Sequence, residues 1–534
     1  MVKSSADHRA RVGEGVAATA ALLVVFYLAS RVLGFVRQAV IASLFGVGPE
    51  ADAWYAAFRI PDTLFTLFAG GALVSALIPV YTRYRDFRDP GDLRRLATGL
   101  FNLVAVFMIV VGALGAVFAQ PLTDLIVPGF DDSTKELTAR ATRWLMLSPL
   151  LLGLAAVAKG ISQSERRFLI PAAGPVFYNI GTITGGILLA GQHGIMGLVW
   201  GTVVGALIHL AIQQVGLARI GITFPFSTVV SHPGVVRVIS LMIPRLLGFA
   251  VIQVSFFFVN FLASLIGPAS VSALANAWLL LLFPVGVLAI PFAEASLPMF
   301  SSRWARGDRD GLAREYHWAL RRVLFLVVPA SVGLAVLAEP VLSVLFERDA
   351  FDAAATALTA GALVFYSVGL AGHGAVEVLG RAFYSMQDTR TPVIIGSVSI
   401  ALHMLVSWLL SLSMGINGLA LGVSVGVLVE MVLLYAVLRR RLPTGAYDRA
   451  TSLSAARTLA ASALMGLTVF GAVWYTWEGG STLPNLGLLI GYIALGAAVF
   501  SIVAGALGSE ELFALARRVR ERLSSLKLYR TRKT

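Results

Sequence analysis

The chain contains 534 residues, of which 57% are hydrophobic and only 13% are charged. Soluble globular proteins carry about 25% charged residues, so this composition excludes an ordinary soluble domain. The formal net charge of +13 would favour a nucleic-acid partner in a soluble protein. Here the basic residues lie in short loops between apolar runs, where membrane orientation and anionic lipid account for them, and no aromatic platform for single strands accompanies them. Cysteine is absent, which excludes disulfides and thiolate metal sites.

Apolar runs long enough to cross a bilayer recur along nearly the whole chain. The first run follows Lys3, Arg9 and Arg11, as in a signal peptide, but it continues through Arg31 and Arg37, which favours an uncleaved first helix. We therefore predict an all-α integral membrane protein with about fourteen transmembrane helices. Their predicted centres lie near residues 30, 68, 108, 150, 180, 205, 250, 288, 326, 370, 402, 428, 465 and 495.

The charges of the connecting loops alternate between basic and acidic along the predicted helices. Because cytoplasmic loops carry an excess of Lys and Arg, the alternation places both termini in the cytoplasm and the protein in the inner, cytoplasmic membrane. The basic loops carry Arg83, Arg85, Arg88, Arg94, Arg95, Arg166, Arg167, Arg303, Arg306, Arg309, Arg314, Arg439, Arg440 and Arg441. The acidic loops carry Glu50, Asp52, Asp131, Asp132, Glu339, Glu347 and Asp349.

Three short motifs recur in order at nearly constant spacing, which indicates an internal repeat. Arg31-Val-Leu-Gly-Phe returns as Arg245-Leu-Leu-Gly-Phe, and Gly194-Ile-Met-Gly-Leu returns as Gly415-Ile-Asn-Gly-Leu. A weaker third match pairs Ala76-Leu-Ile-Pro with Ala295-Ser-Leu-Pro. The repeat predicts two six-helix lobes of the same orientation, which in transporters enclose a central substrate site and alternate its exposure.

The predicted domain organisation follows from these spans and from the repeat. It comprises a cytoplasmic N-terminal segment (1–15), an N-lobe (16–220), a C-lobe (232–441), two extra helices (452–508) and a C-terminal tail (509–534). In the tail, apolar residues recur at helical spacing and the opposite face is basic, so we expect it to lie on the anionic inner leaflet. A solvated, frayed tail is the alternative.

The first span contains two arginines at depths where each charge costs at least roughly 2.5 to 3.5 kcal/mol. Arg31 and Arg37 lie roughly 120° apart around the helix and roughly 9 Å apart along its axis. Guanidiniums so placed could face one aqueous cavity and fork onto the oxygens of a diphosphate. The alternative is structural: Arg37 reaches the outer interface while Arg31 pairs with Asp62 or a backbone carbonyl.

The second span combines a helix-bending proline with a run of small residues. It reads Phe58-Arg-Ile-Pro-Asp62 and then Ala69-Gly-Gly-Ala72. Pro61 removes a helix hydrogen bond, and the small residues allow another helix to approach closely. This pattern fits a moving gate and a static packing site equally well.

The C-lobe also carries ionisable residues within its spans: Arg245, Glu294, His373, Glu377, Arg381 and Glu430. His373 and Glu377 lie at i and i+4 on one helical face, a geometry that can hold a proton or a monovalent cation. They could couple transport to an ion or to the membrane potential, or they could form a buried hydrogen bond. Nucleophile elbows, P-loops and metal-binding runs are absent from the sequence, so we expect neither an enzyme nor a cofactor-binding protein.

With these residues in view, the chain resembles the MurJ/MviN family of lipid II flippases, within the multidrug/oligosaccharidyl-lipid/polysaccharide exporter superfamily. The resemblance runs from about residue 20 to residue 505. It rests on Ser30-Arg-Val-Leu-Gly-Phe-Val-Arg37, Asp52-Ala-Trp, Arg59-Ile-Pro-Asp62, Gly71-Ala72 and the specific run Gly380-Arg-Ala-Phe-Tyr-Ser-Met-Gln-Asp-Thr-Arg-Thr-Pro392.

The resemblance implies a flippase that carries a polyprenyl-diphosphate-linked saccharide, lipid II of peptidoglycan synthesis, to the outer leaflet by alternating access. It implies that Arg31, Arg37 and Asp52 are needed for flipping, that the two arginines meet the diphosphate, and that the last two spans form a groove for the polyprenyl tail. Cell-wall synthesis proteins are further expected partners. The predicted substrate-binding residues are Ser30, Arg31, Arg37, Asp52, Arg59 and Asp62, and the predicted gate or coupling residues are Pro61, Gly71, Arg245, Glu294, His373 and Glu377.

The sequence departs from the family pattern in ways that make the expected cavity less cationic. Phe65 replaces a basic residue, Gly70 an acidic one and Leu279 an arginine of the eighth span, while Glu294 replaces a small polar residue. A rival interpretation is therefore an exporter of another lipid-linked glycan or of an amphipathic drug. A non-transporting scaffold for cell-wall synthesis is another, and a membrane glycosyltransferase is the last.

Overall fold

The computed structural model describes residues 2–69, 71–224, 232–443, 445–480, 483–514, 517 and 521. Side chains are described for these residues except 2–21, 69, 244, 245, 247, 446 and 483. Within these ranges the regular secondary structure is helical, with one isolated bridge between Arg348 and Phe351. The chain forms two compact units, Met1–Ser272 and Ala273–Thr534. The lobe boundaries drawn from the sequence stay predictions.

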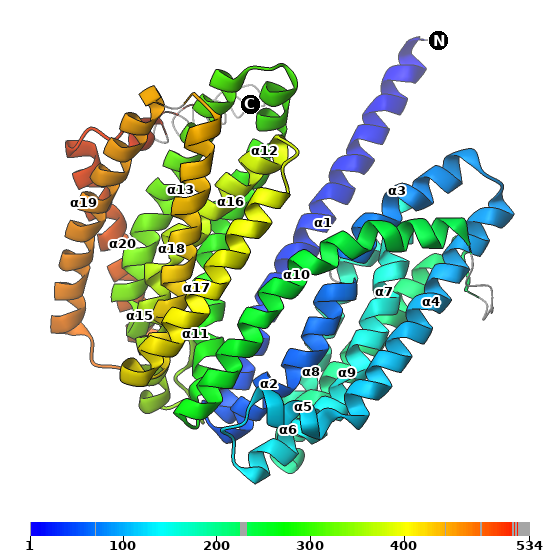
Figure 1. Cartoon of the computed structure of the whole chain (residues 1–534), viewed down its shortest axis with the longest axis horizontal. Helices are drawn as coiled ribbons and strands as arrows, with labels where there is room; N and C mark the ends of the chain where they lie inside the picture. The colour runs from blue at the N-terminus through cyan, green and yellow to red at the C-terminus, as the bar shows by residue number, and fades with distance from the viewer. Residues whose placement is uncertain are drawn as a thin grey trace. The chain divides into compact units, whose positions relative to one another are not determined.

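The first unit, the blue to green part of Figure 1, is a helical bundle in which α7 packs against α3, α4 and α9, and α8 packs against α1 and α9. Its core joins Leu77 and Tyr81 of α3 to Leu96 and Leu100 of α4 and Ile161 of α7. In order, its elements are α1 (Val2–Phe45), α2 (Pro49–Leu64), the π-helix η1 (Phe65–Ala69), α3 (Ala72–Phe87), α4 (Pro90–Val117), α5 (Ala119–Ile126), α6 (Asp132–Leu145), α7 (Leu147–Ser164), α8 (Leu169–His193), α9 (Ile195–Ala218) and α10 (Pro233–Ile266).

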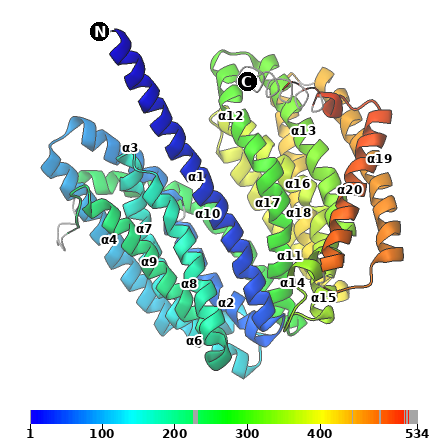
Figure 2. The same cartoon turned by 180° about the vertical axis from the view of Figure 1, so that it is seen from behind.

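The second unit repeats this order and adds two helices, which lie side by side along one edge in Figures 1 and 2. Helix α11 (Ser270–Pro284) begins in the first unit, and it is followed by the π-helix η2 (Val285–Ala289) and α12 (Ile290–Ala305). Then come α13 (Arg309–Val336), α14 (Ala338–Phe346), α15 (Ala353–Val368), α16 (Leu370–Ser385), α17 (Arg390–Met414) and α18 (Ile416–Arg441). The added helices are α19 (Gly445–Thr476) and α20 (Leu483–Ala506).

The described residues contain 13 helices long and apolar enough to cross a membrane, or 14 when α15 and α16, bent by 41°, count as one span. Each of the fourteen centres predicted from the sequence falls within one of these spans, when the bent pair α15 and α16 is included. The prediction of an all-α, multi-pass membrane fold is therefore confirmed.

The internal repeat extends much further than the three motifs that revealed it. Every element from α1 to α9 has a counterpart in order from α10 to α18, and α19 and α20 have none. The chain even repeats its irregular features. Gly194 and Gly415 both end a helix at positive φ, 54° and 57°, and Asp131 and Asp352 both cap a helix N-terminus.

Both repeats interrupt one long span with a short π-helix just after a proline. Pro61 does not end α2, which continues to Leu64, but the helix widens one turn later at Phe65–Ala69. In the second repeat, Pro284 directly precedes Val285–Ala289. A proline lacks the N–H that would bond one turn back, and its ring presses on that turn, so a wider turn relieves the crowding. The structure thus shows a wider turn shortly after Pro61, and the bend predicted there stays a prediction.

Helices α8 and α9 approach each other to backbone contact along a row of glycines. A β-carbon at Gly181 would lie 2.5 Å from the Cα of Gly205, and one at Gly201 would lie 2.5 Å from the carbonyl oxygen of Gly181. The hydroxyls of Thr182 and Thr202 meet at 3.0 Å in the same buried seam. Small residues bring transmembrane helices together in this way because lipid supplies little hydrophobic driving force for their association.

We expect Gly201→Val to destabilise the first unit by at least about 1–3 kcal/mol, because the added methyl groups would overlap the backbone of α8. The measurement is the thermal midpoint of the purified protein in detergent. Gly191→Val is the matched control, since Gly191 also lies in this helix pair and has no atom within 4 Å of its missing β-carbon. Equal midpoints for the two variants would contradict the packing argument.

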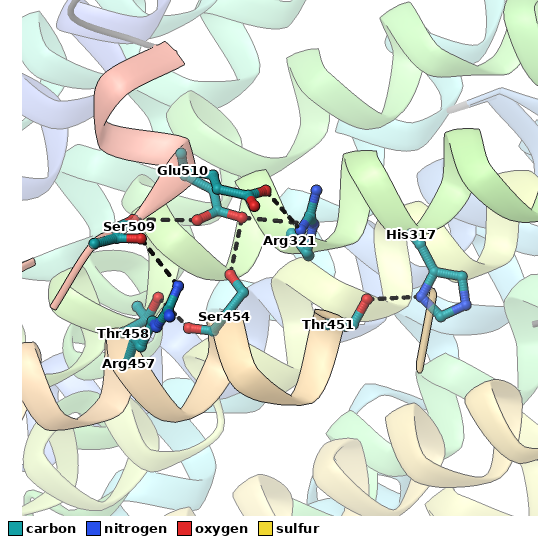
Figure 3. Close-up of polar contacts among 10 residues, drawn as sticks. His317, Arg321, Thr451, Ser454, Arg457, Thr458, Ser509 and Glu510 are labelled. Carbon is teal, nitrogen blue, oxygen red and sulfur yellow. Dashed lines mark hydrogen bonds and ion pairs between the residues drawn. The ribbon is translucent and has the colours of Figure 1, made fainter. Parts of the chain in front are cut away.

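A polar network fastens the two added helices to α13 (Figure 3). The buried carboxylate of Glu511 accepts hydrogen bonds from Ser454 at 2.9 Å and Ser509 at 3.1 Å, and it lies 3.5 Å from the guanidinium of Arg321. Arg321 also reaches the exposed carboxylate of Glu510 at 3.2 Å. One charge on α13 therefore meets two acids that directly follow α20.

We expect Glu511→Ala to lower the thermal midpoint much more than Glu510→Ala. The Glu511 side chain is 6% exposed, so its loss leaves the hydroxyls of Ser454 and Ser509 without their acceptor, at a cost of about 1–3 kcal/mol for each buried hydroxyl. The Glu510 side chain is 75% exposed, and an exposed ion pair contributes about 1 kcal/mol at most. Equal thermal midpoints for Glu511→Ala and Glu510→Ala would show that the buried carboxylate of Glu511 does not hold these helices.

Candidate functional site

The strongest cluster of ionisable groups in the first unit forms around Arg37, where α1, α2 and α8 meet. The Arg37 guanidinium interacts electrostatically with Asp62 and Tyr55 of α2 and with Tyr178 of α8. Its Nε is buried and has no hydrogen-bond partner in the described part of the chain. A buried guanidinium nitrogen left unpaired is costly, so this position favours binding of an anion.

Arg59 adds a second positive charge to this cluster. It lies one helical turn before Asp62 on α2, and the two side chains interact electrostatically. The guanidinium of Arg59 also lies over the ring of Phe256 on α10, 4.7 Å from its centre, a cation–π contact. Close by, the side chain of Gln253 donates a 2.7 Å hydrogen bond to Thr63, so α10 braces this end of α2.

The cluster carries two arginines and one carboxylate, a surplus of one positive charge. Asp62 orients both guanidiniums without neutralising them, because a single carboxylate cannot balance two cations. A phosphate or diphosphate is the anion that a guanidinium binds with two parallel hydrogen bonds. These residues thus have the chemistry to hold a phosphate-bearing ligand.

Arg31 and Ser30 lie on the same helix as Arg37 but outside this cluster. Arg31 is exposed and forms no ion pair with any described residue, so the pairing of Arg31 with Asp62 considered above is not found. The carbonyl oxygen of Ser30 accepts a 3.4 Å hydrogen bond from Asn179 of α8, which ties α1 to α8. It is Arg37, not Arg31, that lies near Asp62.

Asp52 is nearly fully buried and serves a helix end. Its Oδ1 accepts a 2.7 Å hydrogen bond from the backbone N–H of Ser272, in the first turn of α11. A carboxylate in this position satisfies one of the free N–H groups and opposes the positive end of the helix dipole. Its Oδ2 has no partner among the described residues. The hydrogen bond thus joins α2 to the start of α11. The predicted substrate contact of Asp52 stays a prediction.

Two of the predicted gate positions have simple surroundings. Pro61 is buried within α2, just before the π-helix. Gly71 caps the start of α3 and has no atom within 4 Å of its missing β-carbon, so no helix packs closely on it. Gly70 and the side chain of Arg245 lie outside the described residues. Phe65 packs against the hydrophobic core of the first unit, at the position where the family resemblance implies a basic residue.

In the second unit, the acids of α16 and α18 gather around one arginine. Glu377 forms an ion pair with Arg381, one turn further along α16, and it interacts electrostatically with Glu430 of α18. His373 instead meets the ring of Trp278 edge-on, with 5.5 Å between the ring centres. The hydrogen bond between His373 and Glu377, one interpretation of their spacing, is therefore not formed.

The remaining predicted residues of the second unit are isolated. Glu294 is exposed on α12 and forms no ion pair with a described residue. Leu279 is half-buried beside Trp278, so this part of α11 presents apolar surface. Among the described residues, no group of three or more His, Asp and Glu side chains could hold a metal ion.

The specific run from Gly380 to Pro392 forms a capped turn between α16 and α17. Asp388 accepts hydrogen bonds from the backbone and hydroxyl of Thr391, at 2.9 and 2.6 Å, and from Arg441 at 2.5 Å. Burial alone would raise the pKa of Asp388, but these hydrogen bonds outweigh it and lower the pKa to about 2. Gln387 takes a positive φ of 60° to complete the turn. The motif thus stabilises the connection.

Sequence reasoning missed several neighbours of Arg37 and Arg59. Tyr55, Tyr178, Gln253 and Phe256 all line this cluster, and none stands out in a sequence that is rich in aromatic residues. Tyr55 is joined to the cluster by its hydroxyl, which accepts a hydrogen bond from Gln38, the neighbour of Arg37, and this contact is visible only in the structure.

The comparisons with known proteins agree on one family. A family model described as "Lipid II flippase MurJ" matches residues 41–487 of the chain. The probable lipid II flippase MurJ of Vibrio cholerae serotype O1 is 32% identical over 503 residues, which cover 90% of this chain and 94% of that protein. The lipid II flippase MurJ of Burkholderia cenocepacia is 28% identical over 488 residues, 89% of this chain and 94% of that protein.

Solved structures add evidence about the fold. A lipid II flippase MurJ in an inward closed conformation matches with a TM-score of 0.77 at 22% identity, over 90% of this chain and 98% of that one. An inward-facing multidrug resistance MATE family transporter matches with a TM-score of 0.66 at 16% identity, over 79% of this chain and 96% of that one. Together with the family model and the relatives, these matches show that the chain belongs to the lipid II flippase MurJ family.

Proposed function

We propose that this protein is a flippase that moves lipid II from the inner to the outer leaflet of the cytoplasmic membrane by alternating access. The observation that carries this proposal is the buried, unpaired Nε of Arg37 beside Arg59 and a single carboxylate. A diphosphate supplies the missing acceptors and the missing negative charge. The family model and the relatives named lipid II flippase MurJ support the same cargo.

In this proposal the protein moves its cargo without changing a covalent bond, so it is a transporter and not an enzyme. The arginine-rich loops lie in the cytoplasm together with both termini, as loop charge favours. Arg37 and Arg59 hold the diphosphate, Asp62 orients both guanidiniums, and Arg31 is a further contact for the headgroup. Cell-wall synthesis proteins are the partners that supply or consume the lipid.

We expect Arg37→Ala to abolish rescue of a bacterium depleted of its own lipid II flippase, and Arg59→Ala and Arg31→Ala to weaken it. Loss of one charge-assisted contact weakens phosphate binding by about 1.5–3 kcal/mol, which slows transport roughly tenfold to hundredfold. Survival after depletion is the measurement, with membrane abundance checked by immunoblot. Arg140→Ala is the matched control, because Arg140 is exposed and pairs with Glu136 one turn away.

Full rescue by Arg37→Ala would contradict the assignment of the cargo site. A loss of abundance in that variant would mean that Arg37 holds the fold. Failure of the unaltered protein to rescue, with the protein present in the membrane, would favour a different cargo. The apolar residues Phe65 and Leu279, where the family resemblance implies charged side chains, make another lipid-linked glycan the second candidate.

We further propose that Glu377 and Glu430, together with Arg381, couple transport to the membrane potential or to a monovalent cation. Two acids and one arginine leave a surplus negative charge inside a span, which a proton or a monovalent cation can neutralise. In this proposal, Arg381 forms its ion pair with Glu377 when no cation is bound. His373 lies one turn away but is turned toward Trp278.

We expect Glu377→Gln to lose the response of flipping to an imposed gradient, because the surplus negative charge disappears with it. The measurement is flipping of a fluorescent lipid-linked saccharide in proteoliposomes, with and without a potential or a cation gradient. Glu339→Gln serves as the control, since Glu339 is an exposed acid at the start of α14 in the same unit. A Glu377→Gln protein that still responds fully to the gradient would place coupling elsewhere.

A further inference from the structure

The first unit contains a cavity of about 870 Å³ that the proposed transport site does not include. It is formed by one face of the last turns of α3 and one face of the first half of α10. Figure 1 shows this first half of α10 running across α3 before the ribbon bends. Its lining residues are Pro79, Val80, Arg83, Tyr84, Phe87, Arg88, Arg237 and Leu241.

Three arginines converge on this cavity, and none of them has an acidic partner. Arg83, Arg88 and Arg237 are exposed and form no ion pair with any residue that the structure describes. Arg88 lies near the ring of Tyr84, 6.0 Å from its centre, which leaves its charge unbalanced. Like charges gathered on one cavity repel one another, so the arrangement favours an anion between them.

The acids near this cavity are already engaged with other partners. Asp86 pairs with Arg85 at 2.8 Å, Asp89 caps α4 through the N–H of Gly91 at 2.8 Å, and Asp92 bonds to the His232 ring at 3.0 Å. Glu165 interacts electrostatically with Tyr81 and Arg85. None of these acids forms an ion pair with Arg83, Arg88 or Arg237, so an anion from outside the chain can bind the three guanidiniums without displacing an ion pair.

The rest of the cavity wall is apolar, which identifies the class of the anion. Pro79, Val80 and Leu241 provide hydrocarbon surface, and the ring of Phe87 is 81% exposed at the end of α3. The first half of α10 is itself a short apolar helix, Pro233–Ile243, outside the membrane-spanning segment Gly248–Ile266. Short amphipathic or apolar helices beside basic residues lie at the membrane surface, where anionic headgroups meet acyl chains.

We propose that this cavity binds the phosphate headgroup of an anionic lipid from the inner leaflet. Arg83 and Arg237, on facing helices, grip the phosphate, Arg88 closes the site, and the acyl chains pass over Leu241 and Phe87. The ligand bridges α3 and α10, which also contact each other directly, and Tyr84 and Leu241 line the cavity between them. The same chemistry fits a resident phospholipid and the diphosphate end of a cargo lipid that waits at the membrane surface.

The test compares two double variants of the full-length protein that each lose two positive charges. Arg83→Gln with Arg237→Gln removes the facing pair of the cavity. Arg94→Gln with Arg95→Gln is the control, because both are exposed arginines of the neighbouring helix α4 and neither lines the cavity. Native mass spectrometry of each purified protein measures the dissociation constant of dioleoyl phosphatidylglycerol, with dioleoyl phosphatidylcholine as the uncharged-headgroup probe.

We expect the cavity variant to bind phosphatidylglycerol about thirtyfold more weakly than the control, from two lost basic residues near a lipid surface. Phosphatidylcholine binding changes little in either variant. A third variant, Leu241→Trp, fills the cavity and keeps all three arginines, so it should weaken phosphatidylglycerol binding as well. Thermal midpoints within about 2 °C of the unaltered protein confirm that each variant is folded.

The source of the phosphate follows from competition with geranylgeranyl diphosphate, a short polyprenyl diphosphate. Displacement of phosphatidylglycerol from the unaltered protein, lost in the cavity variant, supports a cargo lipid, whereas an absence of displacement supports a resident phospholipid. Phosphatidylglycerol affinities within twofold of the control in both the double cavity variant and Leu241→Trp would overturn the proposal. This outcome is independent of the flipping assay, since Arg37 and Arg59 are intact in every variant.

Discussion

The cost of an ionised side chain in hydrocarbon governs how this protein is built. Each such group costs at least about 2.5–3.5 kcal/mol in a span unless the structure compensates it. Most are compensated locally: Glu377 by Arg381, Asp62 by Arg59, and Asp52 by the first turn of α11. Where compensation is incomplete, the surplus charge indicates a ligand. In the first unit, Arg37 is such a place, because its buried Nε has no partner among the described residues. The arginines of the α3–α10 cavity, outside the span Gly248–Ile266, likewise lack acidic partners in the described part of the chain.

The fold follows from the sequence because three independent signals constrain it. The length of the apolar runs predicts the spans, the loop charges predict their direction, and the repeat predicts two lobes. The π-helices at Phe65–Ala69 and Val285–Ala289 were not predicted. A proline reveals that a helix hydrogen bond is missing, but whether the helix kinks or widens depends on the helices that pack around the next turn. Composition alone does not contain that information.

The candidate site was predictable only in its charged members. Arg37 attracts attention because its charge is expensive, whereas Tyr178 and Phe256 become neighbours only when α8 and α10 are placed. The spacing of His373 and Glu377 suggested a pair, yet Arg381 lies at the same spacing on the other side of Glu377. An arginine keeps its charge under all physiological conditions, so it outcompetes a histidine, which loses its charge readily when buried. Spacing identified the acid correctly but not its partner.

The residues that reveal the family most clearly are not the ones that we propose to bind cargo. The run from Gly380 to Pro392 forms a capped turn in which Asp388 fastens Thr391 and Arg441, and a turn of this kind tolerates few substitutions because each hydrogen bond is specific. This turn therefore identifies the fold and not the cargo. In the proposed function the cargo is held instead by Arg37 and Arg59, while Phe65, where the family resemblance implies a basic residue, packs against the core of the first unit. Because Phe65 is now a packing residue, restoring a basic side chain there would bury an unpaired charge. Under the proposed function, Arg37 and Arg59 therefore bind the diphosphate without a basic side chain at this position.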